Sequence, residues 1–120
     1  MFFFRSKLSY NLALKNYLKD FKIPVGSEEA REIKKKIEEI ISTNVEVRKE
    51  SEQIVVALVA TAIKIGKKEK NKEDLINEGV IWLCSLSQSV AAMYLFRDIR
   101  AINYVGAKEI FEVRLKKYCF

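Results

Sequence analysis

Residues 80–96 read VIWLCSLSQSVAAMYLF, a stretch without a charged side chain in a protein of which 32% is Asp, Glu, Lys or Arg. As a helix this stretch would span about 26 Å, whereas the hydrocarbon core of a bilayer is about 30 Å thick. The stretch is therefore short for a membrane span. We predict instead a long, largely buried helix near 80–104 in a soluble helical bundle, with a membrane helix as an alternative.

One side of this predicted helix carries small and polar residues. At about 100° per residue, four side chains fall within the same sector, namely Ser85, Gln88, Ser89 and Ala92. Glycines of the GxxxG type, which let membrane helices approach closely, are absent from the stretch. We therefore expect this strip to face water, another helix or a second molecule, and we take it as the candidate interface for a protein partner.

Outward from this stretch, apolar residues recur at steps of three and four, which is typical of amphipathic helices. Further helices are expected over 6–21, 28–42 and 46–65. Ser27 is a natural N-cap for the helix at 28–42. Asn71 is a natural N-cap for a fourth helical region, which either continues into the apolar stretch or is divided into two helices at Gly79. The last segment, from about 107, fits a helix better than an alternating strand. The sequence predicts an all-α fold, a single-domain bundle of five or six helices over 1–120.

The chain lacks the residues that common catalytic and metal sites need. It has no histidine, which excludes Ser-His-Asp and Cys-His catalysis and histidine-containing zinc sites within this chain. Its four glycines stand apart, so the glycine-rich phosphate loops are missing too. Cys84 and Cys119 do not form a disulfide framework, and the abundance of Lys, Glu and Ile is typical of hyperthermophile proteins. We expect a cytoplasmic, non-enzymatic protein without cofactor or metal.

The net charge of +6 is concentrated at the two ends of the chain. Residues 1–26 carry five bases against one acid, and residues 80–120 carry six bases against three acids. Because neutralising phosphates supplies affinity for nucleic acid, converging bases are candidates for such an interface. If the two ends meet in space, the nucleic-acid-binding residues are Arg5, Lys15, Lys19, Lys22, Arg97, Arg100, Arg114, Lys116 and Lys117. The alternative is that these bases lie on the solvated faces of amphipathic helices.

The predicted helix at 28–42 has a mixed charge pattern on its outer face. Glu32 and Lys36, and likewise Lys34 and Glu38, are four residues apart and are expected to form ion pairs. This segment as a whole carries four bases against five acids over residues 27–45, so the sequence gives no reason to place a nucleic-acid contact there.

These observations predict a small basic binding protein rather than an enzyme. The favoured function is a nucleic-acid-associated subunit or accessory factor of a nucleoprotein complex, such as a small helical subunit of a defence or replication assembly. One alternative is a protein–protein interaction module, such as an inhibitor or a homo-oligomeric scaffold. A second alternative is a membrane-associated helical protein. Expected partners are RNA or DNA and a protein partner or second copy of the chain, with a membrane the least favoured.

Overall fold

The computed structural model describes residues 7–86 and 104–120. Within these ranges the chain forms five α-helices and one short 3-10 helix, and no strand. Their bounds are α1 Lys7–Asp20, α2 Glu28–Thr43, η1 Val45–Lys49, α3 Glu52–Lys67, α4 Lys72–Ser85 and α6 Tyr104–Cys119. The predicted all-α bundle is confirmed.

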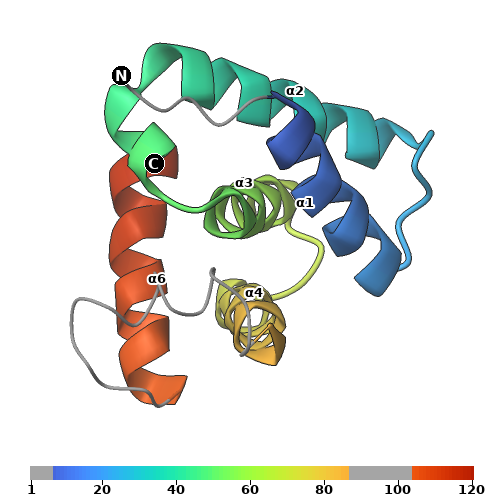
Figure 1. Ribbon diagram of the computed structural model, residues 1–120. Helices are drawn as coiled ribbons and strands as arrows, with labels where there is room; N and C mark the ends of the chain where they lie inside the picture. Colours follow the sequence, from blue (N-terminus) through green and yellow to red (C-terminus); the bar gives the residue numbers. More distant parts are fainter. Residues whose placement is uncertain (1–6, 87–103) are drawn as a thin grey trace.

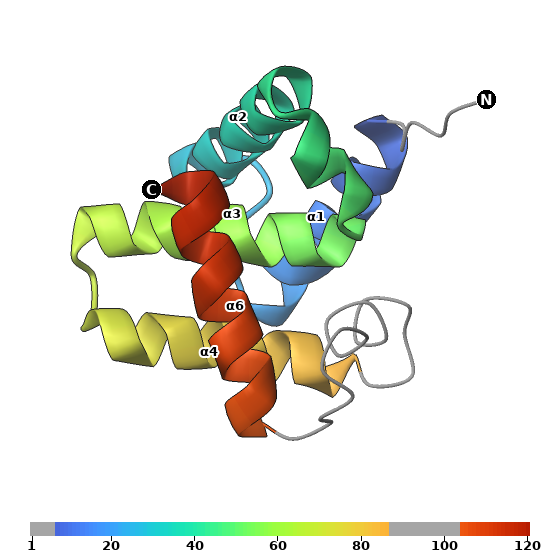
Figure 2. The same ribbon diagram turned by 90° about the vertical axis from the view of Figure 1, so that its left-hand side faces the viewer.

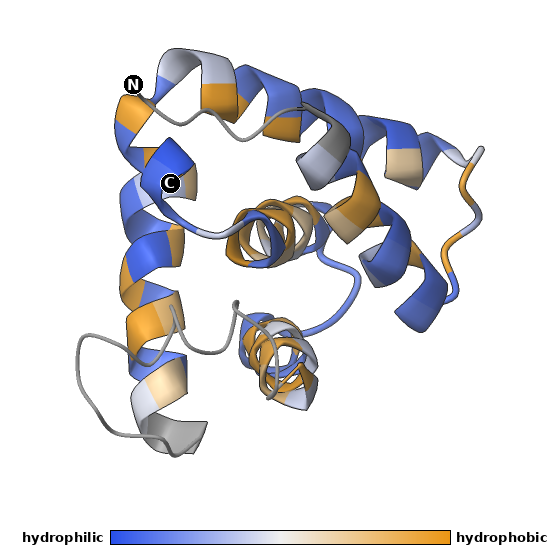
Figure 3. Cartoon of the chain, in the orientation of Figure 1, coloured by the Kyte–Doolittle hydropathy of each residue, from blue (hydrophilic) through white to orange (hydrophobic). Residues whose placement is uncertain are grey.

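Helix α3 lies at the centre of the described bundle (Figure 1). It packs against α1, α2, α4 and α6, and every residue from 54 to 61 is buried. Viewed after a quarter turn, α3 and α4 run antiparallel and α6 crosses both of them (Figure 2). A helix that is enclosed on all sides needs apolar residues all round, and α3 is mostly apolar whereas α2 is hydrophilic along most of its length (Figure 3).

Two helices begin where their capping residues predict. The Ser27 hydroxyl oxygen accepts a hydrogen bond from the Ala30 amide at 3.2 Å, and α2 starts at the residue after Ser27. Asn71 Oδ1 accepts from the Asp74 amide at 3.0 Å, and α4 starts at the residue after Asn71. Each side-chain oxygen satisfies one of the amides that the start of a helix leaves without a partner. Both predicted N-caps are confirmed.

The predicted helix at 46–65 is wrong at its start. Residues Val45–Lys49 form the 3-10 helix η1, and α3 begins only at Glu52. The side chain of Asn44 accepts hydrogen bonds from two amides of η1, and Ser51 caps α3 in the same way. The Ser51 cap therefore divides a segment that the sequence predicted as one helix with polar first turns.

Helix α4 runs without a break through Gly79 and ends at Ser85. The Ser85 hydroxyl donates to the Trp82 carbonyl at 2.6 Å, and the next amide bonds three residues back instead of four. These bonds replace the one that would continue the helix, so they end α4. A long buried helix was expected near 80–104. Its first residues, 80–85, belong to α4, whereas residues 87–103 lie outside the described residues. No helix in 7–86 or 104–120 has the length and apolarity that crossing a bilayer requires.

The last segment is a helix, α6, as preferred from the sequence. In the alternating strand that was the alternative, Phe111, Val113 and Leu115 would share one buried face. In α6, Phe111 and Leu115 are buried, whereas Val113 is exposed. A spacing of four residues between the buried side chains, with the middle one turned outward, is the pattern of a helix packed on one side.

Candidate functional site

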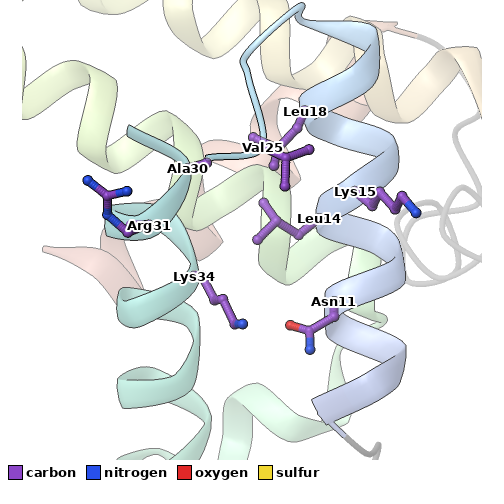
Figure 4. Close-up of a pocket in the computed structure, with 8 residues that line it drawn as sticks. All are labelled: Asn11, Leu14, Lys15, Leu18, Val25, Ala30, Arg31 and Lys34. Carbon is purple, nitrogen blue, oxygen red and sulfur yellow. The ribbon is translucent and has the colours of Figure 1, made fainter. Parts of the chain in front are cut away.

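A groove of about 370 Å³ lies between α1 and α2 (Figure 4). Its apolar lining residues are Leu14, Leu18, Val25 and Ala30. Its polar lining residues are Asn11, Lys15, Arg31 and Lys34. Three of these four polar side chains are cations, so the groove combines an apolar floor with a positive rim.

The helical period places the two lysines at the rim. On each helix a lysine directly follows a buried apolar residue: Lys15 follows Leu14 on α1, and Lys34 follows Ile33 on α2. Neighbouring residues of a helix lie about 100° apart around its axis. Both lysines therefore lie at the edge of a buried stripe, with their charged ends exposed.

The turn between α1 and α2 closes one end of the groove. Lys22 has a left-handed backbone (φ 56°), and the amide that follows it bonds to the Leu18 carbonyl at 2.8 Å. This is the Schellman arrangement, which ends a helix sharply. Arg31 Nη1 donates to the Gly26 carbonyl at 2.8 Å and so ties the turn to α2. The turn presents Val25, whose side chain is 69% exposed, at the groove.

The polar side chains of the groove point in two directions (Figure 4). Lys34 and Asn11 extend toward each other from the facing sides of α2 and α1. Lys15 and Arg31 extend outward on the far sides of α1 and α2. In the part of the chain that the structure describes, none of the three cations has a carboxylate within ion-pair distance. The groove thus has one cation between the two helices, Lys34, and one on each of its two banks, which are the outer sides of α1 and α2.

The acids of α2 do not neutralise this rim. Glu32 pairs with Lys67 of α3 at 2.6 Å, and Glu39 pairs with Lys36 at 2.9 Å. The expected pairs at a spacing of four on this helix are therefore wrong. A cation on the neighbouring helix competes successfully for Glu32, and Lys34 is left without an acid partner.

The predicted nucleic-acid residues of α1 lie beside the groove. Lys15 lines it, Lys19 follows one helical turn later, and Lys22 lies in the turn that closes it. All three side chains are exposed, and none forms an ion pair within the described residues. The sequence did not identify Arg31 and Lys34, which the fold adds to this group.

The predicted residues of α6 have a different environment. Arg114 Nε donates to Glu50 at 2.9 Å, and Lys117 pairs with Glu46 at 3.1 Å. Lys116 is exposed and lines a separate groove between α4 and α6. Acids of and next to η1 therefore neutralise most of this basic cluster locally.

The structure does not bring the two predicted groups together. Helices α1 and α6 pack on opposite sides of α3, which separates their basic residues (Figure 1). Arg5, Arg97 and Arg100 lie outside the described residues, so their positions stay predictions. The same is true of Gln88, Ser89 and Ala92 in the predicted partner interface. Its remaining member, Ser85, is exposed at the end of α4.

A buried lysine of α3 holds α1 in place. Lys64 of α3 is only 7% exposed, and its Nζ donates to the Tyr17 hydroxyl at 2.8 Å. The same Nζ lies 4.2 Å from the centre of the Phe21 ring, a cation–π distance. Trp82 of α4 donates to Asp20 at 2.8 Å and so fixes the C-terminal end of α1. The bank of the groove that carries Lys15 is therefore anchored to both α3 and α4.

Lys64, Tyr17 and Phe21 form what we call the Lys64 cluster, and burial shifts the pKa values of Lys64 and Tyr17. Burial lowers the pKa of the Lys64 ammonium below its ordinary value, while the negative charge of Glu29 acts in the opposite direction. Burial raises the pKa of the Tyr17 hydroxyl, which therefore stays protonated. In the sequence, this cluster is indicated by Lys64, a single lysine close to the end of the apolar run 54–65.

Metal and thiol chemistry find no support in the described residues. No group of three His, Cys, Asp or Glu side chains that could hold a metal ion occurs within 7–86 and 104–120. Cys84 and Cys119 are free thiols, and burial raises the pKa of both, to about 11 for Cys119. A thiol with a raised pKa is a poor nucleophile near neutral pH.

Raising the pH above about 9 is expected to destabilise the protein through the end of α6. Burial raises the pKa of Cys119 from 9.0 to about 11. Burial, helped by the charge of Glu50, raises the pKa of Tyr118 from 10.0 to about 12. The folded state keeps protons that the unfolded state has already released, so the stability contributed by Cys119 and Tyr118 is fully present below pH 9 and falls as pH rises through these values. Urea midpoints measured by circular dichroism from pH 8 to pH 11 test this. The midpoint of Cys119→Ala should fall less than that of the wild type as pH rises above 9.

No protein-family model matches this chain, and no curated protein or solved structure matches it either. The function must therefore be argued from the site itself. A positive rim around an apolar floor suits a ligand that carries both negative charge and apolar surface.

Proposed function

We propose that this protein binds nucleic acid through the groove between α1 and α2, as a non-enzymatic subunit or accessory factor of a nucleoprotein assembly. The observation that supports the proposal best is that Lys15, Arg31 and Lys34 surround one groove without acid partners in the described part of the chain. Cations that are already paired must break those pairs before they contact phosphate, whereas these three need not. Lys19 and Lys22 extend the positive surface along α1.

Phosphate is the anion that this arrangement suits. Arg31 Nη1 donates to the Gly26 carbonyl, and its Nε and Nη2 can donate two parallel hydrogen bonds to one phosphate group, while the lysines act as point charges. Each phosphate that is neutralised releases counterions, so the affinity falls as salt rises. The cations lie on two helices that the Lys64 cluster and the Gly26 contact hold in position. Cations carried on two helices of fixed position favour a ligand with several spaced charges over a single small anion.

Reversing two charges at the groove is expected to weaken binding strongly. The variant Lys15→Glu/Lys34→Glu replaces one cation on the bank and one inside the groove, both exposed, so folding should be unaffected. We expect about a tenfold or greater loss of affinity at low salt, and a plot of log K against log salt that is shallower by about 1.5. Fluorescence anisotropy with labelled RNA and DNA oligonucleotides over a salt series measures both quantities.

A matched control separates position from net charge. Lys49→Glu/Lys72→Glu makes the same change in net charge at two exposed lysines outside the groove. It should retain most of the affinity. Equal losses in the two variants would locate binding elsewhere, and a wild-type protein that binds no oligonucleotide at low salt would remove the proposal.

A further inference from the structure

The centre of the groove is apolar, and contacts to phosphate alone do not use it. Leu14, Leu18 and Val25 point into the space between α1 and α2 (Figure 4). Val25 is 69% exposed, which leaves a valine side chain facing solvent at the end of the groove, between the cations of α1 and α2. Leu14, Leu18 and Ala30 are already buried, so Val25 is the apolar side chain of the groove that a ligand can cover, with a gain of hydrophobic energy as well as charge neutralisation.

We propose, resting on the function proposed above, that the groove selects single-stranded nucleic acid and seats one base on this floor. The cations are arranged for a strand that crosses the groove. Lys15 lies on one bank, Arg31 lies on the other, and the floor lies between them. A strand crossing from bank to bank places a phosphate near each outer cation and a base above Val25.

The groove also has groups for the edge of that base. Asn11 and Lys34 extend toward each other into the groove. The Asn11 amide can donate and accept hydrogen bonds, which suits the polar edge of any base, and Lys34 can donate to a base carbonyl or to the adjoining phosphate. The volume of about 370 Å³ is at the lower end of the range for small-molecule pockets, a size that fits a single nucleotide.

A duplex does not match these features. In duplex DNA or RNA the faces of the bases are stacked inside the helix, and the outer surface presents phosphates and groove edges. A duplex could reach the outer cations but could not put a base face on Val25. A single strand has unstacked bases that can lie on apolar side chains.

The test compares three ligands of equal length with two proteins. The ligands are oligothymidylate, an abasic oligonucleotide that keeps the phosphates but lacks bases, and a mixed-sequence duplex. The proteins are the wild type and Val25→Ser, which keeps the charge and alters an exposed turn residue, so folding should be unaffected. We expect the wild type to bind oligothymidylate about tenfold more tightly than the abasic strand or the duplex. Val25→Ser should lose about fivefold of the affinity for oligothymidylate and none of that for the abasic strand.

The possible outcomes separate this inference from the proposed function. Equal affinity for all three ligands, with the groove charge variant weakening each, would overturn base seating and leave nucleic-acid binding in place. Tighter binding to the duplex would do the same. Failure to bind any of the ligands would remove both, as would binding at the groove of an acidic amphipathic peptide but of no oligonucleotide. A preference for oligothymidylate that Val25→Ser abolishes would support both.

Discussion

Replacing Tyr17 by alanine is expected to lower the free energy of unfolding by about 4 kcal/mol or more. Tyr17 is 1% exposed, its ring stacks on Phe21 with a centroid distance of 4.3 Å, and it meets Trp82 edge-on at 5.1 Å. Removing the ring leaves a cavity among α1, α3 and α4, and it takes away the oxygen that accepts from Lys64. Small domains have only about 5–15 kcal/mol of stability in total, so this loss is a large share.

The hydrogen bond and the ring can be separated by a double-mutant cycle. Tyr17→Phe keeps the ring but leaves the Lys64 ammonium without its acceptor, which should cost about 1–3 kcal/mol. Lys64→Met removes the buried charge and keeps a side chain of similar length, and substitutions of this kind are often neutral or stabilising. In the double variant Tyr17→Phe/Lys64→Met, we therefore expect most of the loss caused by Tyr17→Phe to disappear.

The pH dependence of Lys64→Met provides an independent check. Burial lowers the pKa of Lys64 from 10.5, so the folded state favours the neutral amine. The stability contributed by Lys64 is then fully present only above pH 10.5 and is lost as pH falls through its lower folded value. The advantage of Lys64→Met over the wild type should be largest at neutral pH and should shrink as pH approaches 10.5.

Urea unfolding followed by circular dichroism measures these differences, because the fluorescence of Trp82 depends on the altered ring itself. Leu12→Ala is a suitable control on the same helix, since Leu12 is 56% exposed and should change stability by about 0.5 kcal/mol or less. A loss in Tyr17→Phe that persists unchanged when Lys64 is also replaced would show that the hydrogen bond is not its cause.

The helices that the sequence predicted well are those with local signals. The start of α2 follows from Ser27 and the start of α4 from Asn71, because a capping side chain bonds to amides two or three residues away. The start of α3 was missed because residues 46–51 are mostly polar and charged, and such residues also suit the exposed first turns of a longer helix. Apolar periodicity does not test these turns, whereas Ser51 caps a helix that begins at Glu52.

The groove was only partly predictable, for a physical reason. Lys15 came from the charge excess of the first segment, whereas Arg31 and Lys34 lie in a segment whose net charge is slightly negative. Counting charges along the chain treats Glu32 as a neighbour of the lysines of α2. In three dimensions Lys67 of α3 takes Glu32 instead. Which acids remain free is decided by packing between helices, and the sequence does not contain that information in readable form.

The second large effect is expected at Gly79, where adding a side chain should destabilise the protein even though glycine is a poor helix former. A Cβ atom at this position would lie 2.8 Å from Thr61 Oγ1 and 3.1 Å from Phe111 Cζ. The backbone of Gly79 is helical and has no positive φ, so space and not conformation requires the glycine. Gly79 is the point where α4 meets α3 and α6. We expect a loss of about 1–2 kcal/mol for Gly79→Ala, after the better helix propensity of alanine is included, and about 3 kcal/mol or more for Gly79→Val.

Gly66 supplies the matched control, because it is also helical but nothing lies within 4 Å of its added Cβ. Gly66→Ala should raise the free energy of unfolding by about 0.5–1 kcal/mol, the opposite sign to Gly79→Ala. Thr61→Ala removes the atom closest to the new methyl group, so it should recover part of the loss in Gly79→Ala. Urea midpoints of these single variants and of the double variant Thr61→Ala/Gly79→Ala measure the effects, and a gain in stability at both glycines would show that α4 does not need the close approach to α3 and α6.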